Sequence, residues 1–116
     1  MKPRLFYMLS DEGDPVPCDD MTLWGKWMSL SDRRVDKTDV GGGVQVSTVF
    51  LGIDHDFSDR GVPVLWETMI FGGPHDEYQA RYTSRADALA GHLEAVRLAR
   101  GSRRAIDLTG ESPTCE

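Results

Sequence analysis

The stretch VQVSTVFLGIDHDFSDRGVPVLWETMIFGG, residues 44–73, is the centre of the predicted fold. Two runs of β-branched and aromatic residues flank a polar segment of Asp, Ser, Arg and Gly, which is typical of two strands joined by a loop. Alternate residues of a strand share a face, and the faces that carry Thr48 and Thr68 are otherwise apolar. We therefore predict a central pair of strands over residues 44–53 and 63–72.

The flanking sequence predicts three further strands and two helices. Turn-forming residues after Leu9 end a first strand, and Asp19 and Asp20 can cap a helix of about three turns with Trp24 and Trp27 facing inward. Three consecutive glycines before Val44 suit a hairpin turn. The expected strands are residues 4–9, 33–40 and 78–83, and the second helix, capped by Ser84 and Asp87, should bury Ala86, Leu89, Leu93 and Val96.

This order predicts an α+β fold, with an antiparallel sheet of about four to five strands and two helices packed on one face. A chain of 116 residues is long enough for one hydrophobic core, so we expect a single domain over residues 1–100. The small, charged residues 101–116 predict a loosely held tail. No apolar run reaches the length of a bilayer span, and no secretory signal begins the chain, so a cytoplasmic location is expected.

Charge and cysteine content exclude several classes of function. The formal net charge of −6 argues against direct nucleic-acid binding, which depends on clustered Lys and Arg, and suits a partner with a basic surface. Cys18 and Cys115 do not form a zinc pattern or a disulfide framework. The glycines before Val44 lack the Lys and the following helix of a phosphate-binding loop. We expect no metal and no cofactor.

Four polar residues are candidates for catalysis: Asp54, His55, Glu67 and His92. A His beside carboxylates can act as a general base, and together they could bind a metal or a nucleotide. The alternative is structural, with His92 hydrogen-bonded at the rim of the core and Glu67 paired with Arg81 or a backbone amide, because buried polar groups are nearly always satisfied. The structural interpretation is favoured, because no spacing here matches a known metal motif.

A second set of residues could bind a partner: Asp54, Asp56, Arg81 and Tyr82. The acidic residues lie in the connection between the two central strands, which lacks the Gly and Glu positions of a helix-loop-helix calcium site. Arg and Tyr favour interfaces, and an exposed pair could stack a base or contact a protein.

The strings VSTVFLGIDHDF, PVLWETMIFGG and RYTSRADALAGH, in this order and spacing, resemble a group of small proteins encoded by tailed phages and prophages. The resemblance covers residues 46–96, and the sequence after Gly101 lies outside it. It implies a phage-type protein in a bacterial host cell, without implying a reaction. The matching positions that it singles out are Asp54, His55, Glu67, Thr68, Arg81, Tyr82 and His92.

A small acidic protein of this type is expected to act by binding a host protein, such as a component of an antiviral defence system like CRISPR. Its acidic face would then occupy a basic nucleic-acid-binding surface on that protein. Two alternatives remain open. One is a nucleotide-binding or metal-dependent enzyme that uses Asp54, His55, Glu67 and His92. The other is a structural or assembly protein that forms a homodimer through an open sheet edge or face.

Overall fold

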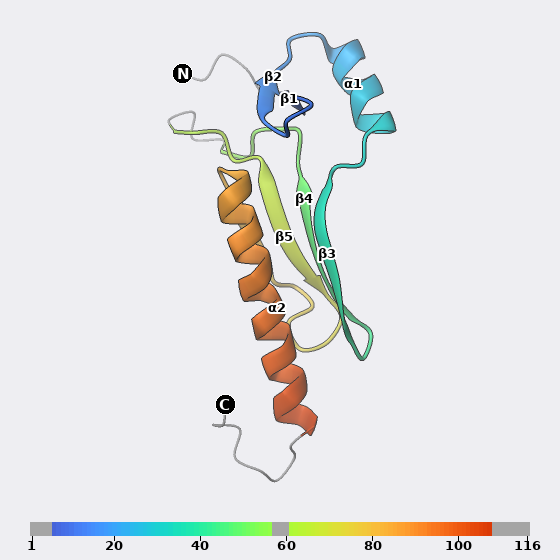
Figure 1. Cartoon of the computed structure of the whole chain (residues 1–116), viewed down its shortest axis with the longest axis vertical. Helices are drawn as coiled ribbons and strands as arrows, with labels where there is room; N and C mark the ends of the chain where they lie inside the picture. Colours follow the sequence, from blue (N-terminus) through green and yellow to red (C-terminus); the bar gives the residue numbers. More distant parts are fainter. Residues whose placement is uncertain (1–5, 57–60, 108–116) are drawn as a thin grey trace.

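The computed structural model of the chain describes residues 6–56 and 61–107, arranged as a sheet with one long helix and a smaller unit at one end (Figure 1). The elements in chain order are β1 (Tyr7–Leu9), β2 (Pro15–Pro17), α1 (Met21–Leu30), β3 (Arg34–Gly41), β4 (Val44–Phe50), β5 (Trp66–Phe71), β6 (Gln79–Tyr82) and α2 (Arg85–Asp107). The fold is α+β: a four-stranded antiparallel sheet and a small hairpin, with two helices packing against the sheet.

Strands β3 to β6 are neighbours in chain order, as expected for strands joined by short links. The central pair has Thr48 of β4 opposite Thr68 of β5, so the predicted pairing is confirmed. Gly42 and Gly43 form the turn between β3 and β4 with positive φ angles of 65° and 80°, which a residue with a Cβ rarely adopts. β6 continues the sheet at its edge beside β5.

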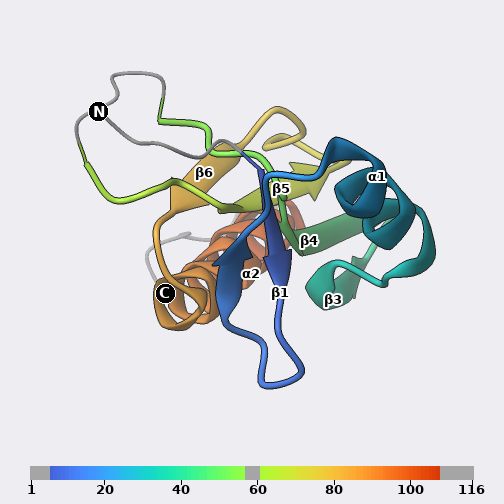
Figure 2. The ribbon, with the colours of Figure 1, turned by 90° about the horizontal axis from the view of Figure 1, so that it is seen from above.

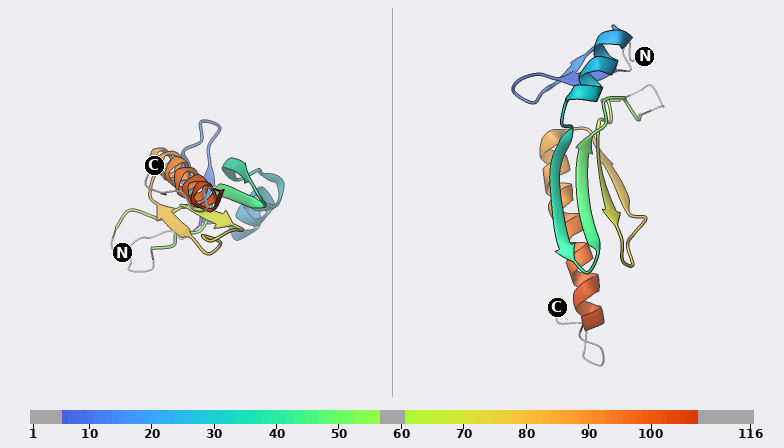
Figure 3. Two further views of the ribbon diagram at one scale, coloured as in Figure 1. Left: turned by 90° about the horizontal axis from the view of Figure 1, so that it is seen from below. Right: turned by 90° about the vertical axis from the view of Figure 1, so that its right-hand side faces the viewer.

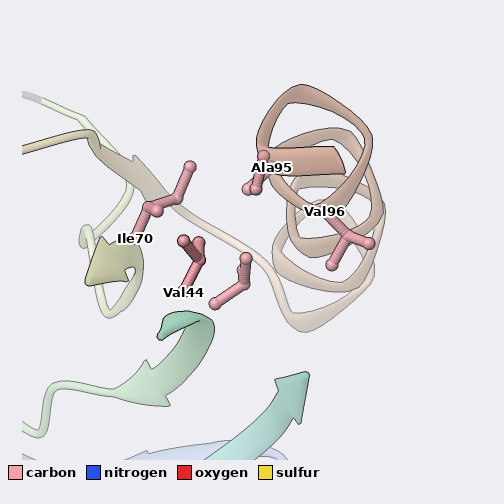
Figure 4. Packing of buried hydrophobic residues seen from close by; sticks show 6 residues of the cluster. Val44, Ile70, Ala95 and Val96 are labelled. Atoms are coloured by element: carbon pink, nitrogen blue, oxygen red, sulfur yellow. The ribbon is translucent and has the colours of Figure 1, made fainter. Parts of the chain in front are cut away.

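Helix α2 covers one face of the sheet. Val44, Ile70, Ala95 and Val96 belong to an apolar cluster near the hairpin end of the sheet (Figure 4). A second cluster at the opposite end contains Phe50, Leu65, Trp66 and Ala88.

The predicted buried stripe of α2 is partly wrong. Val96 is buried, but Leu93 is 62% exposed and the residues against the sheet are mostly small ones, such as Ala88 and Ala95. A Cβ at Gly91 would overlap the Tyr82 hydroxyl, so the helix approaches the sheet too closely for larger side chains there.

The β1–β2 hairpin and α1 lie together beyond the ends of β3 and β4 (Figures 1 and 2), and Tyr7 of β1 is buried in the second apolar cluster. Asp20 caps α1, since its Oδ1 accepts hydrogen bonds from the amides of Thr22 and Leu23, both at 3.0 Å. The Trp24 indole N–H donates to the carbonyls of Tyr7 and Gly52, at 3.2 and 3.1 Å. The Trp27 ring meets Phe50 edge-on, so α1 packs against the end of the covered face.

In the described part of the chain, no helix covers the other face of the sheet (Figure 3, right). Helix α2 runs to Asp107, past the position at which we expected the tail to begin. Residues 108–116, like Cys115 within them, lie outside the described residues.

Candidate functional site

A buried polar layer lies between the two apolar clusters, where the middle of α2 crosses the sheet. His92 of α2 is 1% exposed, and Thr48 and Thr68 have no exposed surface. The His92 Nδ1 lies 2.8 Å from the Thr48 hydroxyl, which lies 2.5 Å from the Thr68 hydroxyl. On its other side, Nε2 lies 2.9 Å from the Thr38 hydroxyl. One histidine and three threonines therefore form a continuous hydrogen-bonded chain.

The neighbouring carboxylate favours one tautomer of His92. Asp36 Oδ2 lies 3.7 Å from Nε2, and a carboxylate can only accept a hydrogen bond. This charge favours the neutral ring with its proton on Nε2, and in that tautomer Nδ1 accepts from the Thr48 hydroxyl. Burial lowers the pKa of His92 below its usual value of 6.5, and Asp36 opposes this effect more weakly. The ring is neutral at physiological pH.

This layer has groups that enzymes use but does not have access to a substrate. A hydroxyl beside an imidazole can act as a nucleophile and base pair. Here both hydroxyls next to the ring belong to residues in the interface between α2 and the sheet, and Thr48 and His92 are at most 1% exposed. The layer fixes the position of α2 along the sheet, because sliding the helix would break these buried hydrogen bonds.

Sequence reasoning missed Thr38, Thr48 and Asp36 as partners of His92. A signal was present, because Thr48 and Thr68 interrupt apolar strand faces at positions that the register places opposite each other. A hydroxyl on a buried face must find a polar partner. His92 is the one histidine of the predicted second helix, so it was the natural candidate for that partner.

Asp54, His55 and Asp56 brace the start of the connection that follows β4. Asp54 is 2% exposed, and its Oδ1 accepts hydrogen bonds from the amides of Asp56 and Val64, at 2.8 and 2.9 Å. The His55 Nδ1 lies 2.8 Å from the Ile53 carbonyl oxygen. These contacts hold the two sides of the connection together, and they use the buried carboxylate of Asp54, which we had named as a binding candidate.

Glu67 lies on the uncovered face, opposite Arg81 of β6. The Arg81 Nε donates to Glu67 Oε2 at 2.9 Å, which confirms the structural alternative for Glu67. His92 packs on the covered face, so the sheet separates it from Glu67. The four candidate catalytic residues therefore do not enclose a common site.

Arg81 and Tyr82 do not form one binding patch either. They are consecutive residues of β6, and consecutive residues of a strand point to opposite faces. Arg81 is on the uncovered face with Glu67, whereas Tyr82 is half-buried against α2.

Negative charge is concentrated in the unit formed by β1, β2 and α1, residues 6–32, which we call the acidic head. It contains six acidic residues and a single basic one, Lys26, which gives a formal charge of −5. The acidic residues are Asp11, Glu12, Asp14, Asp19, Asp20 and Asp32, and all of them are exposed. The head therefore accounts for most of the formal net charge of −6.

The acidic head also exposes apolar side chains. Leu30 is 79% exposed, Met21 61%, Leu23 49% and Val16 41%. No residue of α1 is fully buried. Exposed apolar and acidic side chains therefore occur together in the acidic head.

Within residues 6–56 and 61–107, no group of three or more His, Cys, Asp or Glu is placed to hold a metal ion. The same part of the chain contains no helix with the length and apolarity needed to cross a membrane.

No protein-family model matches the sequence, and no curated protein or solved structure matches it either.

Proposed function

We propose that the protein acts by binding another protein through its acidic head, with the partner presenting a basic surface such as a nucleic-acid-binding groove. The observation that carries this proposal is the formal charge of −5 over residues 6–32, next to exposed Met21, Leu23 and Leu30. Clustered like charges speed encounter with a surface of opposite charge, and apolar contacts then slow dissociation.

The architecture of the head supports this role. Tyr7 joins the head to the sheet, because it is buried in the second apolar cluster. The Gly52 carbonyl also accepts hydrogen bonds from the Tyr7 amide and the Trp24 indole, at 2.9 and 3.1 Å. The exposed apolar side chains of α1 are not used in those contacts. The head can therefore present them to a partner without losing its attachment to the sheet.

The resemblance of residues 46–96 to proteins of tailed phages suggests the class of partner. A phage-type protein that covers a basic groove would block a host nuclease or its guide complex, so we name a bacterial antiviral defence complex as the target. This choice rests on the resemblance, whereas the binding mode rests on the charge and exposure of the head.

The test compares two variants that remove the same charge from different places. Asp11→Asn with Glu12→Gln neutralises the turn of the head, and Glu77→Gln with Glu94→Gln neutralises two exposed carboxylates outside the head. Each tagged protein is used to capture partners from bacterial lysate at low and moderate salt. We expect the head variant to lose its partner and the control to retain it. Equal capture by both variants, or no capture by the unchanged protein, would contradict the proposal.

A further inference from the structure

The uncovered face of the sheet is the largest feature that the proposed function leaves unused. Antiparallel partners point to the same side, so the register defines three rows across this face. The first row is Arg34, Val49, Glu67 and Arg81; the second is Lys37, Ser47, Met69 and Gln79; the third is Asp39, Gln45 and Phe71. The first row lies at the end next to the acidic head, and the third lies next to the β3–β4 turn.

This face has an apolar centre and a charged border. A hollow of about 90 Å³ is lined by Ser47, Val49, Glu67, Met69 and Phe71. Phe71 is 46% exposed. Arg34 and Lys37 are exposed on the edge strand β3, with no ion-pair partner among the described residues. A partner could bury the apolar centre of this face, and its acidic groups could pair with the two cations.

We propose that two copies of this chain pack face to face through this surface. They are related by a two-fold axis that lies between the two sheets and runs perpendicular to the strands. The occupant is a second copy because the face complements itself in charge. Sheets that pack face to face align within about 30°, so the axis runs close to parallel or close to perpendicular to the strands. The two choices bring different rows together.

An axis that is perpendicular to the strands and follows the second row places the first row of one copy over the third row of the other. Arg34 of each copy then faces Asp39 of the other, which gives two ion pairs for each dimer. Phe71 of each copy faces the end of the hollow that contains Val49 and Glu67. Lys37 faces its own equivalent near the axis, and this is the one unfavourable charge contact.

An axis parallel to the strands is disfavoured by charge. It places Arg34 of one copy over Arg81 of the other, so cation faces cation. It also brings the two acidic heads side by side at one end, each with a formal charge of −5. In the perpendicular arrangement the heads lie at opposite ends of the dimer and remain accessible.

The size of the face predicts a weak dimer. Four strands about 4.8 Å apart, with about six residues each at about 3.4 Å per residue, give a footprint of roughly 400 Å². Stable interfaces bury about 800 Å² on each partner. We therefore expect reversible association at high micromolar concentration.

Sedimentation equilibrium of the full chain, from micromolar to millimolar concentration, tests the arrangement with a charge swap. Arg34→Glu and Asp39→Arg should each weaken the dimer about ten-fold, because each turns two attractions into two repulsions. The double variant should recover to within about three-fold of the original. Lys37→Gln should strengthen the dimer. Arg100→Glu, which makes the same charge change on α2, should have no effect.

A second pair of variants tests the apolar packing of the dimer without changing its charge. Phe71→Ser should abolish association, whereas Leu93→Ser on the outer side of α2 should leave it unchanged. A monomer at all concentrations would overturn the proposal. So would a dimer that is insensitive to Arg34→Glu, or a double variant as weak as the single ones. Circular dichroism and urea unfolding of each variant show whether the fold is retained, since Asp39→Arg also removes the hydrogen bond to the Gly41 amide.

Discussion

Lowering the pH from about 8 to about 5.5 should destabilise this protein through His92. The folded state lowers the pKa of this group below 6.5 because the ring is buried. A group whose folded pKa lies below its unfolded pKa binds more protons when the chain is unfolded. Its stabilisation is therefore complete above about pH 6.5 and is lost as the pH falls from there towards the lower folded pKa.

The hydrogen bonds of His92 give a structural reason why stability should fall, and not rise, at low pH. Protonation would make Nδ1 a donor, and the Thr48 hydroxyl would have to turn from His92 towards Thr68. One proton can change the unfolding free energy by at most about 1.4 kcal/mol per pH unit. Between pH 8 and 5.5 the total loss should approach about 1.4 kcal/mol only if the folded pKa lies well below 5.5, because the unfolded group is only half protonated at pH 6.5.

Urea unfolding at a series of pH values measures the effect, with His92→Gln as the variant that does not titrate. This variant should be about 1–3 kcal/mol less stable at pH 8, because a buried threonine hydroxyl loses its partner. Its unfolding free energy should change less between pH 8 and 5.5 than that of the unchanged protein. Asp36→Asn should steepen the dependence, since it removes the carboxylate that favours the protonated ring. Equal pH dependence with and without His92, or a measured His92 pKa above 6.5, would contradict this role of the buried ring.

Three further substitutions test the contacts of α2, the head and the uncovered face. Gly91→Ala should lower the unfolding free energy by about 1–3 kcal/mol in urea, because its Cβ would overlap the Tyr82 hydroxyl; no loss would mean that α2 lies farther from the sheet. Trp24→Phe should remove the two hydrogen bonds that hold α1 to Tyr7 and Gly52, and so speed amide exchange in α1 but not in β4; a uniform change would contradict this local attachment of α1. Glu67→Gln should cost no more than about 1 kcal/mol, because its partner Arg81 is partly exposed; a larger loss would indicate a role beyond this pair.

The sheet could be predicted from the sequence because strand alternation is a strong and local signal. The faces of β4 and β5, the glycine turn and the Ser84 cap all follow from residue type and spacing. The Glu67–Arg81 pair was one of two alternatives for Glu67, and the register decides between them.

The orientation of α2 could not be predicted in the same way. Hydrophobic periodicity assigns the core to the largest apolar side chains, here Leu89 and Leu93. The close approach of α2 to Tyr82 instead selects small residues, and this depends on a strand that is distant in the sequence. The separation of Glu67 from His92 likewise depends on which face α2 covers.

Amide hydrogen exchange on the complex with the captured partner shows whether the acidic head is the binding surface. Exchange should slow in the acidic head, from the β1–β2 turn through α1, with little change in α2. Protection on α2 or on the sheet alone, with the head exchanging as in the free protein, would contradict binding through the acidic head.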